Sequence, residues 1–233
     1  MMKDKIKHFV FGLIVFLLYF KIIPFGLSLI IGYFKDSNNL VQNIVLSIAE
    51  IIIFLILFMI FKKIIITDFK KMKNDLRKNL NIGFKYYFVG FLIMIASNLL
   101  LTIIFGGMAT NEEVNRQYLK IYPLYSVVAM VFAGPLIEEI VFRLGFRKSF
   151  DKWLPYALFS GLFFGALHVY TAFEGMAFAE MLKNWNQILY IVPYSALGFA
   201  FAKAYYETDN IWTTMIIHVL HNAFTVFLVF TAM

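Results

Sequence analysis

The sequence contains no cysteine among its 233 residues. This absence excludes disulfide bonds, zinc sites built on cysteine, and cysteine nucleophiles. Charge is also scarce, because Asp, Glu, Lys and Arg together make up 15% of the chain. We find no internal repeat and no low-complexity tract. Little of the chain is therefore suited to form a soluble domain.

Apolar residues fill most of the sequence: 61% of it is hydrophobic, and the mean hydropathy is +0.77. Soluble domains are roughly 45–50% apolar even when glycine is counted, and a helix needs about 20 apolar residues to cross a bilayer. We predict an all-α, polytopic membrane helix bundle that forms a single integral membrane domain over residues 1–233. Seven spans are expected, with six and eight as alternatives, at about 9–33, 40–62, 84–106, 122–146, 155–173, 186–206 and 211–231.

The first span begins after a short basic segment, as a signal peptide would. No small-residue cleavage pattern follows, because Phe20, Lys21 and Ile22 occupy that place. We therefore expect this span to be retained. Lys21 and Pro24 predict that it is kinked or tilted.

Lysine and arginine gather in three segments: the N-terminus, residues 62–79 and residues 147–152. Seven spans with the N-terminus inside place all three in the cytoplasm, in agreement with the positive-inside rule. We expect a multi-pass protein of the cell membrane. The net charge of +7 indicates contact with anionic lipid headgroups and no nucleic-acid partner. Segment 66–80 is either an interfacial helix with Phe69, Met72 and Leu76 on one face, or a solvated linker.

Two adjacent carboxylates, Glu138 and Glu139, lie inside the apolar stretch 127–143. A charged residue at the bilayer centre costs at least about 2.5–3.5 kcal/mol. Arg143 follows Glu139 by four residues, so the two share a helix face and the guanidinium favours an ionised Glu139. Glu138 points about 100° away, toward a partner helix or a cavity. Gly134-Pro135 can bend this helix and leave a carbonyl unpaired.

Two later spans also carry polar residues: His168 in one, His218, His221 and Asn222 in the other. Singly, each polar group is explained by hydrogen bonds that hold helices together, just as Glu139 and Arg143 alone could form a structural ion pair. Together, a carboxylate, two imidazoles and an amide suit hydrolysis. A glutamate can activate water, a histidine can orient the water or hold a metal, and His and Asn can donate to an oxyanion. Two histidines and a carboxylate also suit zinc.

Glu50 in the second predicted span and Asn98 in the third are further polar residues at membrane depth. Each could line a cavity or serve packing alone. Other intramembrane protease types fit less well, because the sequence has no Gly-x-Ser-x-Gly, Gly-x-Gly-Asp or His-Glu-x-x-His motif.

Three motifs occur in order: Glu138-Glu139-x-x-x-Arg143, Phe164-x-x-x-His168 and His218-x-x-x-Asn222. This set resembles the signature of the CAAX protease and bacteriocin-processing (Abi) family of intramembrane endopeptidases. The resemblance places a catalytic core at residues 120–231. His221 lies beside the third motif and is not required by it.

The resemblance implies that Glu138 activates a water together with His168. His218 and Asn222 then complete the site as oxyanion donors or as further ligands, and Glu139 and Arg143 form a supporting pair. It leaves open whether the enzyme is metal-free or holds one divalent metal, zinc, on Glu138, His168 and His218.

The same resemblance implies cleavage of a membrane-associated peptide or protein, in bacteriocin, leader or signalling-peptide processing or in self-immunity. Two other functions remain open: a non-catalytic immunity or scaffolding protein that binds a bacteriocin or a sensor partner, and a small transporter or proton relay. The sequence does not indicate an oligomeric state.

Overall fold

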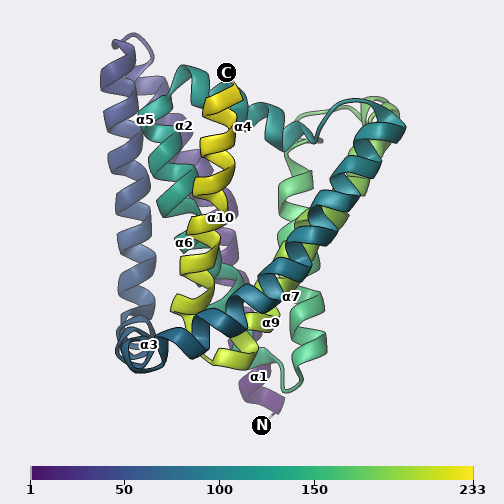
Figure 1. The fold of residues 1–233 in the computed structure, drawn as a ribbon. Coiled ribbons are helices and arrows are strands. Elements are labelled where there is room, and N and C mark those ends of the chain that lie inside the picture. The colour runs from purple at the N-terminus through teal and green to yellow at the C-terminus, as the bar shows by residue number, and fades with distance from the viewer. Residues whose placement is uncertain (1, 233) are drawn as a thin grey trace.

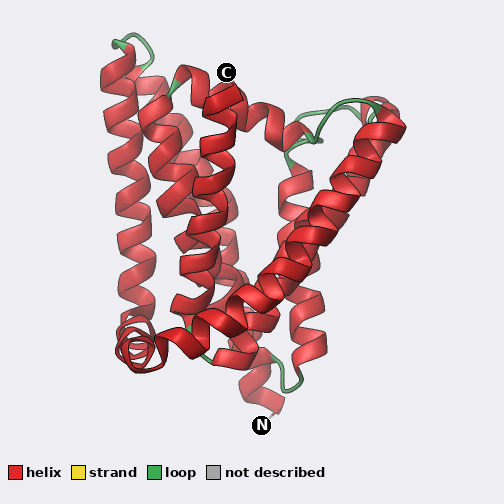
Figure 2. Cartoon of the chain, viewed as in Figure 1, coloured by secondary structure: helices red, strands yellow, loops and turns green. Residues whose placement is uncertain are grey.

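A computed structural model describes residues 2–232 of the chain. All regular secondary structure in this part is helical, and short loops join the helices (Figure 2). The predicted all-α class of the membrane bundle is confirmed. Many large apolar residues are exposed, where lipid can cover them.

The first two helices form one continuous rod with an irregular turn in the middle. α1 (Met2–Leu17), the π-helical segment η1 (Leu18–Ile22) and α2 (Ile23–Phe34) follow one another without a loop. A π turn adds a residue to the helical repeat and is one of the recognised causes of helix bending. The irregularity expected around Lys21 is therefore present.

α3 (Asn39–Phe105) is longer than any single predicted span. Its first turn is capped by the side chain of Asn38, which accepts a hydrogen bond from the Val41 amide. Asp75 departs from helical backbone angles, with φ −115° and ψ 21°, and divides α3 into two arms that run in different directions (Figure 1). Segment 66–80 is thus helical and not a linker. Of the three residues expected on one face, Met72 is buried while Phe69 and Leu76 are exposed.

The remaining chain adds three longer helices and several short helical pieces. They are α4 (Thr110–Ile121), α5 (Pro123–Ser126), η2 (Val127–Ala133), α6 (Gly134–Glu139), η3 (Ile140–Leu144), η4 (Arg147–Ser149), α7 (Trp153–Tyr170), α8 (Phe178–Lys183), η5 (Trp185–Tyr190), α9 (Ile191–Thr208) and α10 (Ile211–Ala232).

Four helical stretches are long and apolar enough to cross a membrane by length and composition: Met2–Phe34, Asn39–Phe105, Trp185–Thr208 and Ile211–Ala232. The count of seven spans stays a prediction. The two ends of the chain lie at opposite ends of the bundle (Figure 1), as an odd number of crossings requires.

The basic segments gather at the N-terminal end of the bundle. Lys5 forms an ion pair with Asp151, next to the basic residues 147–152. Asn210, just before α10, donates its side-chain amide to the Asp68 carbonyl at 2.8 Å, and the Trp212 indole donates to the Ile65 carbonyl at 2.9 Å. One end of the bundle is therefore strongly basic, although its cytoplasmic placement stays a prediction.

α7 and α9 pack closely because glycines face each other. A Cβ added at Gly161 would lie 2.8 Å from the Phe199 nitrogen, and one at Gly198 would lie 3.0 Å from the Gly161 Cα. Small residues let membrane helices approach to backbone contact. This close packing fixes the height of His168, which lies near the end of α7.

Candidate active site

The Glu139–Arg143 pair is completely buried, with both side chains 0% exposed. The Arg143 guanidinium donates to Glu139 through Nε at 3.0 Å and Nη2 at 3.3 Å. Its Nη1 donates to the Ser160 hydroxyl of α7 at 2.5 Å. A forked guanidinium matches the two oxygens of a carboxylate. The ion pair expected from the four-residue spacing is present, and it ties α6 and η3 to α7.

The two glutamates end a helical turn that has π-helical turns on both sides, η2 before α6 and η3 after it. The Gly134 amide donates to the Ala129 carbonyl, five residues back. The next donor would be residue 135, which is a proline without an N–H. The Met130 carbonyl therefore lacks a helical donor, as the Gly134-Pro135 pair led us to expect.

Asn222 of α10 satisfies this orphaned carbonyl: its Nδ2 donates to the Met130 oxygen at 2.7 Å. Burying a carbonyl without a donor is costly, so this bond joins α10 to the bent helix. One of the two hydrogens on the Asn222 side-chain amide is used in this bond. The expectation that Asn222 serves as an oxyanion donor stays a prediction, and in the structure the residue contacts backbone.

His218 of α10 lies between the two adjacent glutamates. Its Nδ1 is 3.0 Å from Glu139 Oε1, and its Nε2 is 3.6 Å from Glu138 Oε2. Because Glu139 is paired with Arg143, it acts as an acceptor, and Nδ1–H is the donor. Nε2 is then directed toward Glu138, at a separation too long for a direct hydrogen bond. Part of this histidine's role is thus to connect the two carboxylates.

His168 is held by its own helix. Its Nδ1 lies 2.9 Å from the Phe164 carbonyl, which can only accept, so Nδ1 carries the proton and Nε2 is free to accept. The imidazole also stacks on the Tyr194 ring at 4.7 Å between centroids. The Phe164–His168 spacing therefore fixes both the tautomer and the orientation of this ring.

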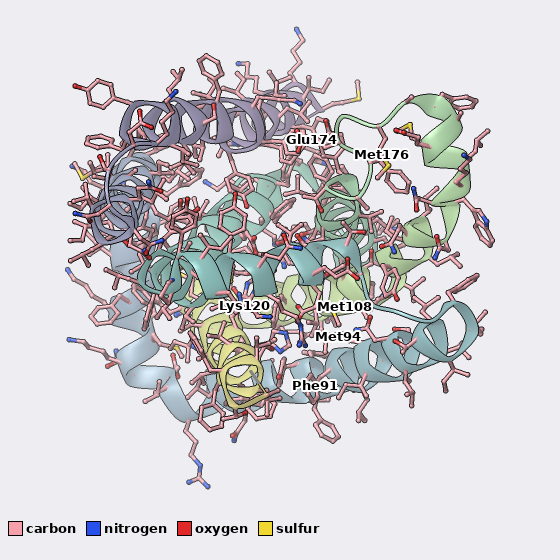
Figure 3. All side chains as sticks on the ribbon, turned by 90° about the horizontal axis from the view of Figure 1, so that it is seen from above. Phe91, Met94, Met108, Lys120, Glu174 and Met176 are labelled. Carbon is pink, nitrogen blue, oxygen red and sulfur yellow. The ribbon has the colours of Figure 1, made fainter. Side chains whose placement is uncertain are left out.

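One cavity of about 550 Å³ joins these residues. Ligand sites are typically 300–1,000 Å³. Its lining includes all four predicted catalytic residues: Glu138, His168, His218 and Asn222. The walls come from both halves of the sequence, with Asn98 on the second arm of α3 and Glu112 and Arg116 on α4. Two of its lining residues, Met94 and Met108, are labelled in the view from the C-terminal end (Figure 3).

Three other polar residues from the sequence lie in or beside the cavity, since Glu50 interacts electrostatically with Glu138 and the other two, Asn98 and His221, belong to the lining. Asn98 lines the cavity, whereas Glu50, which is 7% exposed, is not among its lining residues. His221 lines it too, and its Nδ1 lies 3.2 Å from the Tyr87 hydroxyl. Two tyrosines were missed: Tyr194, which stacks on His168, and Tyr19, whose hydroxyl donates to Glu138 Oε1 at 3.3 Å. With 13 tyrosines in the chain, the sequence offers no signal that selects these two.

The three residues named as possible zinc ligands line the same cavity, and whether they hold an ion stays a prediction. Among residues 2–232, no group of three His, Asp or Glu side chains is placed to hold an ion. Glu138 and His218 face each other, and the hydrogen bond from His168 Nδ1 to a carbonyl leaves the Nε2 of that histidine available. We base the chemistry below on the side chains alone.

Several known proteins are similar to this chain. The sequence model described as "Type II CAAX prenyl endopeptidase Rce1-like" matches residues 120–224. "Membrane-embedded CAAX protease MroQ" of Staphylococcus aureus (strain USA300) is 29% identical over 198 residues, covering 79% of this chain and 76% of that protein.

Two further relatives match with lower identity. "Putative membrane peptidase YdiL" of Bacillus subtilis (strain 168) is 27% identical over 124 residues, covering 52% of this chain and only 43% of that relative. A protein of Mycoplasma capricolum without an assigned activity is 24% identical, covering 96% of this chain and 67% of its own length. No solved structure matches the chain significantly.

Proposed function

We propose that this chain is an endopeptidase of the CAAX protease and bacteriocin-processing family that hydrolyses a membrane-associated peptide, as its similarity to the family model and to two named membrane peptidases supports. The observation that carries the proposal is the shared cavity, in which Glu138, His168 and His218 meet from α6, α7 and α10. Ionisable residues at membrane depth are costly, and three helices contribute them to one place.

Glu138 is the general base in this proposal. It takes a proton from a water molecule as the water oxygen attacks the scissile carbonyl carbon, and it later gives that proton to the departing amine. Its Oε2 is the oxygen that faces His218, so the water is expected beside that oxygen. Glu139 is less suited to this role, because Arg143 occupies both of its oxygens.

The two histidines have different roles in this proposal. His218 donates its Nδ1–H to the Glu139 carboxylate, an arrangement that orients an imidazole. The protonated Nε2 can then donate to the oxyanion that develops on the carbonyl. His168, with a free Nε2, accepts a hydrogen bond from the other O–H of the attacking water and holds the water in line.

The cavity walls favour a peptide that is apolar for most of its length. Methionine, leucine and valine side chains line it together with asparagines and the Glu112–Arg116 pair of α4. We propose a membrane-associated bacteriocin, leader or signalling peptide as the substrate. It would enter from the end of the bundle where α4 and the C-terminus lie (Figure 1).

The deciding experiment compares the peptides released by host cells that carry either the wild-type protein or Glu138→Gln. We expect at least one peptide to be cleaved only in the wild type, and its termini to define the cleaved bond. Glu174→Gln is the matched control, because Glu174 is an exposed glutamate outside the cavity lining. It should leave the peptide pattern unchanged.

A second experiment uses the purified protein in lipid vesicles. Glu138→Ala and His168→Ala should each abolish cleavage of the recovered peptide without lowering the amount of folded protein. Wild-type cleavage by both variants would overturn the proposed function. If host cells carrying Glu138→Gln remain as immune to a bacteriocin as cells carrying the wild type, a non-catalytic immunity or scaffolding role would be favoured instead.

A further inference from the structure

α1 and the helix that carries the glutamates touch at a pair of glycines. The Cα atom of Gly12 lies 3.6 Å from the Cβ position of Gly145. A Cβ added at Gly12 would lie 2.6 Å from the Gly145 carbonyl oxygen and 2.8 Å from the Phe146 ring. Such spacing leaves no room for a side chain. This contact fixes the height of α1 against η3.

Two helical turns from this contact, the same two helices meet again at the site. α1 runs away from the basic end while α6 and η3 run toward it (Figure 1). Tyr19 follows Gly12 by seven residues, and Glu138 precedes Gly145 by seven. Seven residues are close to two turns, or about 10 Å, so both pairs lie on the facing sides of antiparallel helices. The Tyr19 hydroxyl reaches Glu138 Oε1 at 3.3 Å.

The local backbone at Tyr19 is as unusual as the backbone around the glutamates. Within residues 2–232 there are three π-helical segments: η2 and η3 flank α6, and η1 contains Tyr19. Such turns are rare, frequently lie at functional sites, and turn side chains away from the regular helical positions. All three segments thus lie in the helices that bring Tyr19 and Glu138 together.

Tyr19 and His218 contact different oxygens of the same carboxylate. Tyr19 donates to Oε1, and His218 Nε2 faces Oε2. Tyr19 is not among the residues that line the cavity, so it approaches Glu138 from behind. A carboxylate held at Oε1 cannot rotate freely, and Oε2 remains directed toward His218. Positioning of this kind is worth large factors in rate, because small misplacements of a reacting group are costly.

From this geometry we infer that Tyr19 is a positioning residue for Glu138. It lies in the N-terminal helix, outside the residues matched by the family model. The inference rests on the proposed endopeptidase activity, and it adds that the N-terminal helix completes the site by holding the general base. It predicts an effect on turnover with little effect on substrate binding, since Tyr19 lies behind the carboxylate.

The test uses the full-length protein in lipid vesicles and a quenched fluorescent peptide that carries the cleavage-site sequence recovered from host cells. Tyr19→Phe keeps the ring and removes only the hydroxyl. We expect kcat to fall about tenfold or more, as for loss of a hydrogen bond to a charged group, with KM unchanged and only a small fall in Tm. Tyr33→Phe is the matched control, because Tyr33 is 81% exposed on α2. It should match the wild type.

The possible outcomes separate the two claims. If Tyr19→Phe turns over the peptide at the wild-type rate, the positioning role is wrong while the proposed function stands. An increase in KM alone would make Tyr19 a substrate contact, and a marked fall in Tm would make it a structural residue; either result overturns the inference. If the wild-type protein cleaves no peptide, the proposed function fails and the role of Tyr19 fails with it.

Discussion

His218 Nδ1 lies 3.0 Å from Oε1 of Glu139, the carboxylate that Arg143 already neutralises. The bond joins α10 to α6 within the buried part of the bundle. It also directs the other ring nitrogen toward Glu138, at 3.6 Å. The adjacent glutamates thus have different tasks: Glu139 orients a histidine, and Glu138 faces the cavity with it.

Removal of this histidine should affect catalysis more than folding. We expect His218→Ala to lower kcat for the recovered peptide about 100-fold or more, the usual range for a general acid–base group. Glu139 keeps its guanidinium partner, so the protein should remain folded. His8→Ala, in α1 away from the cavity lining, is the control and should retain full activity. Equal rates for both variants would contradict the role of His218.

The chain contains two Glu–Arg pairs with the same four-residue spacing, and they make a matched comparison. Arg143→Ala leaves Glu139 buried without its cation and should destabilise the protein by about 3–5 kcal/mol. Arg116→Ala breaks the pair with Glu112. The Arg116 and Glu112 side chains are 40% and 29% exposed, so the loss of stability should be about 0–1 kcal/mol. Thermal unfolding in detergent measures both. Similar losses of stability in the two variants would show that burial does not determine how much each ion pair contributes.

Asn222 and Pro135 should be energetically coupled through the Met130 carbonyl. Asn222→Ala removes the donor and should cost about 1 kcal/mol. Pro135→Ala restores an N–H to the helix, which can donate to the freed carbonyl. The double variant should therefore lose less stability than the two single changes added together. A strictly additive double-mutant cycle would disprove this account of the hydrogen bond.

Metal dependence can be tested directly on the purified protein. Because no group of three His, Asp or Glu side chains among residues 2–232 is placed to hold an ion, we expect cleavage of the recovered peptide to persist after prolonged dialysis against EDTA. Elemental analysis should find less than one zinc per chain, with the same content in Glu138→Gln. Loss of activity on dialysis, restored by zinc, would contradict the metal-free reading and support the ligand set Glu138, His168 and His218.

The absence of cysteine makes orientation simple to measure, since any introduced cysteine is the only one. We expect a membrane-impermeant maleimide to label intact cells at Glu174→Cys but not at Lys73→Cys, because the basic end of the bundle should face the cytoplasm. Both positions are exposed in the structure. Labelling at Lys73→Cys alone would reverse the predicted topology and the side from which substrate enters.

Much of the local structure was predictable, because helix periodicity acts over a few residues. The spacing of Glu139 and Arg143 was enough to predict their ion pair, and Pro135 was enough to predict an unpaired carbonyl nearby. The helical continuity of α3 was not predictable, because its basic middle segment 66–80 resembles an ordinary loop in hydropathy. Its helix is supported by tertiary contacts such as the bonds of Asn210 and Trp212 to its backbone.

The sequence by itself determined that this is a membrane-embedded helical protein whose ionisable residues lie on particular helix faces, because hydropathy and the 3.6-residue repeat are properties of each segment alone. Only the tertiary structure decided which faces meet. That His218 bridges the glutamates, that Asn222 reaches Met130 and that Tyr19 reaches Glu138 all depend on the relative heights of separate helices. Those heights are set by contacts between distant residues, such as Gly12 with Gly145, which no local pattern encodes.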